Sequence, residues 1–228
     1  MEIKLEEKLK SAVWAARSLF ERGKATGSSA NMSFRHGDRI YITCSGSCFG
    51  TLEARDFVPL TMDGRICPEA EPGTKPSKEW PLHLTLFEKS SEIGAVIHVH
   101  SLYSVLWSFV PAAAQEDCIP DHTPYLRMKL GSVGLIPYEK PGSPALFEAF
   151  RERAEKSDGF LLKNHYGRIL LSGGAGRKRP YCLGTAQGRA GLRAVAVFPP
   201  FSPSFHQNPG MLQCRKQFEA ASPKCFRT

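Results

Sequence analysis

The chain has 228 residues, of which 42% are hydrophobic and 23% charged, and this composition is typical of a globular protein with one sizeable core. Its apolar stretches are too short to cross a membrane and its amphipathic start argues against a secretory leader, so we expect a cytoplasmic protein without membrane contacts. The net charge of +8 suggests a nucleic-acid partner, but residues 1–172 hold 21 residues of each sign, and the excess lies in residues 173–228.

The predicted elements alternate between helical and strand patterns. The first elements are an amphipathic helix over 4–22, a hairpin over 31–46 that turns at His36-Gly37-Asp38, and a short helical turn followed by a strand pair around Asp63-Gly64. After a proline-rich loop come a helix over 80–90, a buried strand over 94–100 and a helix from about Tyr103. The last elements are a strand near 134–138, a helix over 145–156 and a strand over 159–173. Hairpins with interspersed helices predict an α/β fold with a mixed, largely antiparallel sheet covered by helices.

The buried strand carries two histidines, His98 and His100, in the run GAVIHVHS. Residues two apart on a strand point to the same face, so both rings project side by side. Two imidazoles on one face are half of a metal site. A pair of hydrogen-bonded core histidines is the alternative, and further ligands are needed to decide between them.

Two more residues could complete this site. His165, in LLKNHYG, would make a set of three histidines, which suits a catalytic zinc with an open position, although alone it is more often structural. Glu79, in KPSKEWPLH, opens a helix, and its carboxylate could reach the metal or move a proton. The alternative for Glu79 is an acidic residue that stabilises a helix dipole. His83, one turn later, is interpreted as structural.

Five segments in order resemble the class II aldolase/adducin family over residues 5 to about 172: TGSSANMSFR, ITCSGS, KPSKEWPLH, AVIHVHS and LLKNHYG. The resemblance implies zinc, or another divalent metal, on His98, His100 and His165. It implies Glu79 as the acid/base, which also touches the metal. It further implies a three-layer α/β/α domain and a homotetramer with active sites between subunits.

Three small, hydroxyl-rich turns, GSSAN (27–31), SGS (45–47) and PSK (76–78), offer backbone N–H groups and side-chain donors. Such clusters are usually only turns. Within the family pattern we interpret them as the site that holds a phosphate, with Lys78 adding a point charge. The candidate binding residues are Gly27, Ser28, Asn31, Ser45, Gly46, Ser77 and Lys78.

Within the family, the segments GSSANMSFR, SGSCFGTL and PSKE are most similar to the 3-oxo-tetronate 4-phosphate decarboxylases. This similarity implies a zinc-dependent lyase that converts a phosphorylated four-carbon sugar acid to dihydroxyacetone phosphate and carbon dioxide through a metal-stabilised enediolate. The alternative is a fuculose-phosphate type aldolase, a branch that usually has serine where Lys78 stands. A second alternative is a non-catalytic, adducin-like interaction module.

Residues 173–228 form an atypical basic tail after the domain over 1–172, with nine basic residues and one acidic residue. The family usually continues here into a Glu-rich amphipathic helix, but RKRPYCLGTAQGRAGL has no acidic residue and contains a proline. A reading frame shifted by one nucleotide from Lys178 can encode a helix patterned with leucine and glutamate. We therefore expect an irregular tail that arises from a shifted frame, with a genuine divergent tail as the alternative, and we expect no nucleic-acid partner.

Overall fold

The computed structural model describes residues 4–101, 104, 107–108, 117–119, 128, 131–163 and 168–171. Its elements, in chain order, are α1 (Leu5–Glu21), β1 (Asn31–His36), β2 (Arg39–Thr43), the short 3-10 helix η1 (Ala54–Asp56), β3 (Phe57–Thr61), α2 (Trp80–Lys89), β4 (Ala95–Val99), β5 (Val133–Ile136), α5 (Pro144–Ala154), β6 (Gly159–Leu162) and β7 (Arg168–Leu171). The helices expected over 4–22, 80–90 and 145–156 are confirmed as α1, α2 and α5. Most of the helix expected from about Tyr103, and the whole tail, lie outside the described residues.

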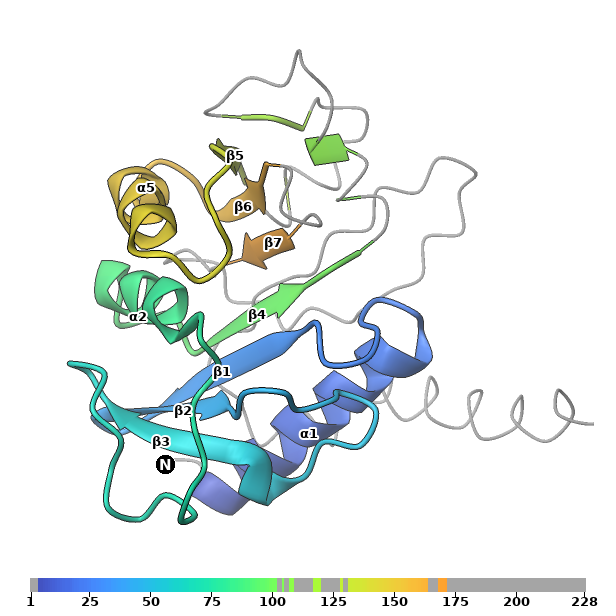
Figure 1. Cartoon of the computed structure of the whole chain (residues 1–228), viewed down its shortest axis with the longest axis vertical. Coiled ribbons are helices and arrows are strands. Elements are labelled where there is room, and N and C mark those ends of the chain that lie inside the picture. Colours follow the sequence, from blue (N-terminus) through green and yellow to red (C-terminus); the bar gives the residue numbers. More distant parts are fainter. Residues whose placement is uncertain are drawn as a thin grey trace, which may run out of the picture.

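One seven-stranded sheet runs through the molecule in the order β3-β2-β1-β4-β7-β6-β5 (Figure 1). Strands β5 and β6 are parallel, and the other five adjacent pairs are antiparallel. The predicted mixed, largely antiparallel sheet is therefore confirmed. Strand β4 lies in the middle of this sheet and is buried along its whole length, which explains why its sequence is a continuous apolar run apart from His98.

Two strand predictions need correction. The single last strand expected over 159–173 is two strands, β6 and β7, which pair antiparallel. Strand β6 ends at Leu162 and β7 begins at Arg168, so the expected strand is not continuous. The strand pair expected around Asp63-Gly64 consists of β3 and an isolated bridge between Leu60 and Ile66, because the returning segment is too short to form a strand.

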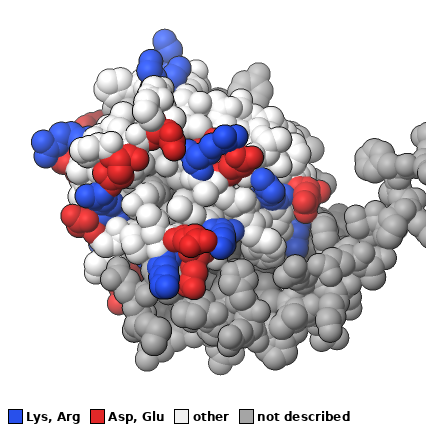
Figure 2. All heavy atoms as spheres, turned by 90° about the horizontal axis from the view of Figure 1, so that it is seen from below, with Lys and Arg blue, Asp and Glu red and all other residues white. Residues whose placement is uncertain are grey.

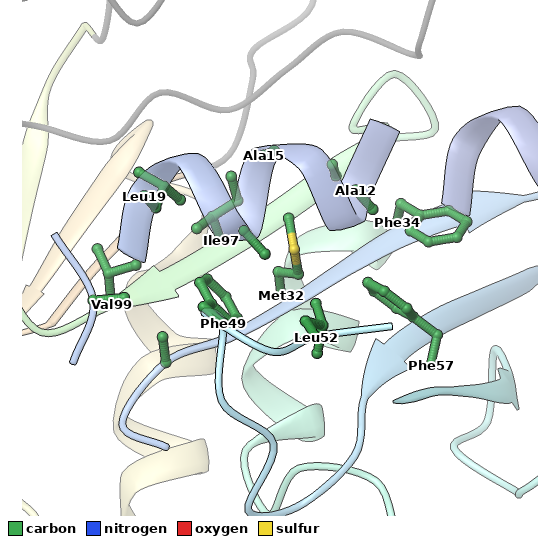
Figure 3. Close-up of a cluster of buried hydrophobic side chains, with 14 of the residues drawn as sticks. Ala12, Ala15, Leu19, Met32, Phe34, Phe49, Leu52, Phe57, Ile97 and Val99 are labelled. Atoms are coloured by element: carbon green, nitrogen blue, oxygen red, sulfur yellow. The ribbon is translucent and has the colours of Figure 1, made fainter. Parts of the chain in front are cut away.

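Helices cover both faces of the sheet, which confirms the predicted three-layer α/β/α arrangement. Helix α1 packs on one face through a cluster of buried side chains that point toward one another in Figure 3: Ala12, Ala15, Leu19, Met32, Phe34, Phe49, Leu52, Phe57, Ile97 and Val99. Helices α2 and α5 pack on the other face, where Leu82 and Phe150 belong to a second cluster with Val96 of β4. Side chains alternate along β4, so His98 points to the same side as Val96, toward α2.

The described surface carries mixed charge. On the face that Figure 2 shows, Lys and Arg side chains are interspersed with Asp and Glu, and neither sign gathers into one large patch. This distribution agrees with the balanced charge of residues 1–172. Among the described residues, the helices are too short or too polar for any of them to cross a membrane.

Candidate metal and proton-transfer site

The two histidines of the HxH motif lie together at the end of β4. His98 is fully buried in the strand, and His100 follows directly after the strand ends. Their ring centroids are 5.8 Å apart with the planes tilted by 46°. The i, i+2 spacing thus places two imidazoles side by side, as expected for residues on one face of a strand. The third predicted histidine, His165, lies outside the described residues.

Glu79 brings a carboxylate to this pair. It is the N-cap residue of α2 and is only 6% exposed. Its Oε2 atom lies 2.9 Å from His98 Nδ1 and accepts a hydrogen bond of 3.0 Å from Asn31 Nδ2. Asn31 reaches the same atom because β1 pairs with β4 in a register that places Asn31 opposite His98. The carboxylate therefore contacts the strand histidine directly. The Glu79 side chain makes no capping hydrogen bond to the backbone of α2.

His83 supports this arrangement from the next turn of α2. The ring is fully buried; Nδ1 lies 2.7 Å from Ser33 Oγ, and Nε2 lies 2.6 Å from Asn31 Oδ1. Burial, and secondarily the neighbouring His98, lowers the pKa of His83 to about 3, so its imidazole is neutral at physiological pH. From the sequence, His83 was interpreted only as structural. The i, i+4 spacing of Glu79 and His83, which places both on one helix face, is the signal that could have linked them.

Two of the three hydroxyl-rich turns meet beside the site. The turn over 45–47 and the segment over 76–78 are joined by a bridge between Cys44 and Pro76. Ser45 N donates to the Lys75 carbonyl at 2.8 Å, and Ser77 N donates to the Thr43 carbonyl at 3.0 Å. Because Glu79 is only two residues beyond Ser77, these turns lie close to the carboxylate.

The third turn, over 27–31, comes to the same end of the β1–β2 hairpin. It leads into β1 where β2 ends, and Met32 N donates to Thr43 Oγ1 at 3.2 Å. The candidate phosphate ligands differ in exposure: those that are exposed are Gly27, Ser28, Ser45, Gly46 and Lys78. Ser77 is buried, and its Oγ accepts a hydrogen bond of 3.4 Å from Glu79 N. The Asn31 side-chain amide contacts Glu79 and His83, and its role as a phosphate ligand stays a prediction.

The donor set at the end of β4 suits a borderline divalent cation. Two imidazoles and one carboxylate are ligands that zinc accepts, and they lie at the edge of the core rather than on open surface. Within the described ranges, no group of three His, Cys, Asp or Glu side chains is arranged to hold an ion by itself. Coordination of a metal by His165 stays a prediction, because that residue lies outside the described residues.

Known proteins resemble this chain in sequence and in fold. The model of the Class II Aldolase and Adducin N-terminal domain matches residues 10–166. The 3-oxo-tetronate 4-phosphate decarboxylase of Haemophilus influenzae is 37% identical over 154 residues, which are 67% of this chain and 71% of that protein. The L-fuculose phosphate aldolase of Methanocaldococcus jannaschii is 35% identical over 156 residues, which are 68% of this chain and 80% of that aldolase. The crystal structure of YgbL from Klebsiella pneumoniae has a TM-score of 0.69 at 31% identity, covering 75% of this chain and 80% of its own. This chain therefore belongs to the class II aldolase/adducin family.

Proposed function

We propose that the protein is a carbon–carbon lyase that decarboxylates a 3-oxo-tetronate 4-phosphate to dihydroxyacetone phosphate and carbon dioxide. The observation that carries this proposal is the buried Glu79 carboxylate, held between Asn31 Nδ2 and His98 Nδ1 beside a second imidazole. The similarity to the decarboxylase of Haemophilus influenzae supports the choice of substrate. Fold alone would not fix it, because one fold serves many reactions.

The proposed metal ligands are His98, His100, His165 and Glu79, and zinc is the proposed ion. When bound, such an ion withdraws electron density from substrate oxygens and stabilises the negative charge left as the carbon–carbon bond breaks. The histidine rings must be neutral to bind it.

Glu79 is the proposed proton carrier. Loss of carbon dioxide breaks the bond between C1 and C2 of the substrate and leaves the electron pair on the remaining carbons. A proton must then reach C2 to give dihydroxyacetone phosphate. Glu79 is suited to deliver that proton because its carboxylate is 6% exposed, is fixed by Asn31, and adjoins the histidine pair.

The three hydroxyl-rich turns are the proposed phosphate site. Ser28, Ser45 and Lys78 are exposed at the end of the hairpin where these turns meet, and Gly27 and Gly46 leave backbone N–H groups accessible there. Ser77 holds the backbone of Glu79, so the phosphate site and the proton carrier share one short segment. Binding of the phosphate would thus align the other end of the substrate with Glu79.

An aldolase acting on a sugar phosphate is the second candidate, since the aldolase of Methanocaldococcus jannaschii is 35% identical. Both reactions break a bond next to a carbonyl carbon and need the same acid/base and metal. The leaving group distinguishes them: carbon dioxide in one case and an aldehyde in the other. We further propose a homotetramer, a catalytic domain over 1–172 and a separate tail over 173–228. A non-catalytic interaction module would not need a buried carboxylate beside paired histidines.

A substrate screen with the full chain tests this proposal. The panel contains 3-oxo-tetronate 4-phosphates of both C2 configurations, the unphosphorylated acids and L-fuculose 1-phosphate, with release of carbon dioxide and of aldehyde monitored separately. We expect carbon dioxide from a phosphorylated acid and little turnover of the acid without phosphate. Aldehyde release alone would favour the aldolase, and no reaction of any substrate by the zinc-loaded protein would count against the proposal.

A further inference from the structure

A chain of buried hydrogen bonds leads from Ser33 to the proposed proton carrier. Ser33 Oγ lies 2.7 Å from His83 Nδ1, His83 Nε2 lies 2.6 Å from Asn31 Oδ1, and Asn31 Nδ2 lies 3.0 Å from Glu79 Oε2. All four side chains are at least nine-tenths buried. Each of these groups is therefore shielded from water, and its partner within the chain determines its orientation.

The direction of each bond follows from the chemistry of the groups. A carboxylate oxygen only accepts, so the Asn31 amide must present its N–H₂ to Glu79 and its oxygen to His83. An amide oxygen also only accepts, so His83 Nε2 carries the proton and donates it. Its Nδ1 is then an acceptor and receives the Ser33 hydroxyl. Because His83 is neutral at physiological pH, the tautomer with the proton on Nε2 is the one that satisfies both contacts.

The geometry of the two elements explains why these four residues meet. Glu79 and His83 are four residues apart at the start of α2, and Asn31 and Ser33 are two residues apart on β1. Each spacing places its two side chains on one face of its element. Two polar side chains at the start of the helix therefore meet two on the strand, and the Asn31 amide lies between Glu79 and His83.

We propose that His83 is a positioning residue of the lyase reaction, which locks the Asn31 amide so that its N–H₂ holds the Glu79 carboxylate in place. This inference rests on the proposed role of Glu79. Without His83, the oxygen of the Asn31 amide loses the N–H group that donates to it. The amide can then rotate and turn that oxygen toward the Glu79 carboxylate. Removing a supporting residue of this kind typically lowers activity or metal affinity by about 10- to 100-fold.

Four variants of the full chain test the proposal. His83→Leu removes both ring nitrogens, whereas His83→Gln keeps an amide N–H₂ near the position of Nε2. Ser33→Ala removes the remote end of the chain, and His36→Gln, at the other end of β1, is the matched control. Three properties are measured for each: the histidine tautomers by ¹⁵N-resolved NMR, zinc affinity by competition with a chromophoric chelator, and kcat and KM for the substrate found in the screen.

In wild type we expect one neutral imidazole protonated on Nε2, whose signal is lost in both His83 variants. His83→Leu should lower kcat and zinc affinity by about 10- to 100-fold with KM changed little. His83→Gln should restore most of the loss, Ser33→Ala should lose less, and His36→Gln should match wild type. If His83→Leu does not fold, the proposal is still tested by the tautomer of His83 in wild type and by the Ser33→Ala and His83→Gln variants.

Two results would overturn the proposal: a wild-type His83 protonated on Nδ1, or a folded His83→Leu with wild-type kcat and zinc affinity. A comparison with Glu79→Gln separates this failure from that of the proposed function. If Glu79→Gln is inactive while His83→Leu is fully active, only the positioning role is wrong. If Glu79→Gln is as active as wild type, the proposed function of Glu79 is wrong, and the NMR and zinc measurements still test whether His83 orders the site.

Discussion

Replacing Gly64 with alanine should destabilise the protein through a contact next to the site. Gly64 has φ of +82°, and a Cβ atom there would lie 2.2 Å from the Trp80 ring. Trp80 directly follows Glu79, and its ring packs against the core under α2. The left-handed conformation should cost about 1–2 kcal/mol for a residue with a side chain. Displacing a large packed ring should add about 1–3 kcal/mol.

Gly73→Ala is the matched control for this prediction. Gly73 has φ of +78°, nearly that of Gly64, but a Cβ atom there would have no neighbour within 4 Å among the described residues. The control should therefore show the conformational cost alone. The two variants should differ in unfolding free energy by about 2 kcal/mol, which corresponds to roughly 6 °C in Tm for a chain of this size.

Chemical denaturation followed by circular dichroism would measure both free energies, and thermal scans would give the two values of Tm. A larger loss of kcat in Gly64→Ala than in Gly73→Ala would show that the displaced ring also disturbs Glu79. Equal stability of the two variants would refute the reasoning, because it would mean that the Trp80 ring moves aside at no cost.

Three further predictions concern the site and the tail. Purified protein should carry about one zinc per chain, and alanine at His98, His100 or His165 should remove it, since too few ligands remain; metal analysis that finds undiminished zinc in all three variants would end the zinc proposal. Glu79→Gln should keep most of the metal but lose about 10²- to 10⁴-fold in kcat, because an amide cannot exchange protons at neutral pH; steady-state kinetics with wild-type values would remove Glu79 from the mechanism. Sequencing the gene around codon 178 should reveal a helix patterned with leucine and glutamate in the frame shifted by one nucleotide; its absence would mean that the basic tail is the genuine product of the gene.

Local pattern was enough to predict most of the fold. The helical spacing of apolar residues predicted α1, α2 and α5 correctly. The i, i+2 spacing predicted that His98 and His100 lie side by side, as they do in the structure. The division of the last strand into β6 and β7 was missed because both halves are apolar, and nothing in their alternation shows where the chain reverses. Local pattern thus predicts which segments form elements better than it predicts how they pair.

The support of Glu79 was not predictable in the same way. Asn31 lies within a turn motif and was interpreted only as a phosphate ligand, but its amide also contacts Glu79 and His83. That contact depends on the register of β1 against β4, which places Asn31 opposite His98 although the two are far apart in sequence. Register is a property of paired strands and is not encoded in the spacing of either strand alone.

The polar contacts between α2 and β1 have a consequence for the order of folding. The partners in these three hydrogen bonds are 48, 50 and 52 residues apart along the chain. Folding that depends on contacts between such distant residues takes on the order of milliseconds or longer, whereas a helix forms in about a microsecond. The helical signal should therefore recover early when denatured protein is returned to native buffer. Enzymatic competence should return only when helix and strand have docked, so catalysis would report the completion of tertiary structure in this chain.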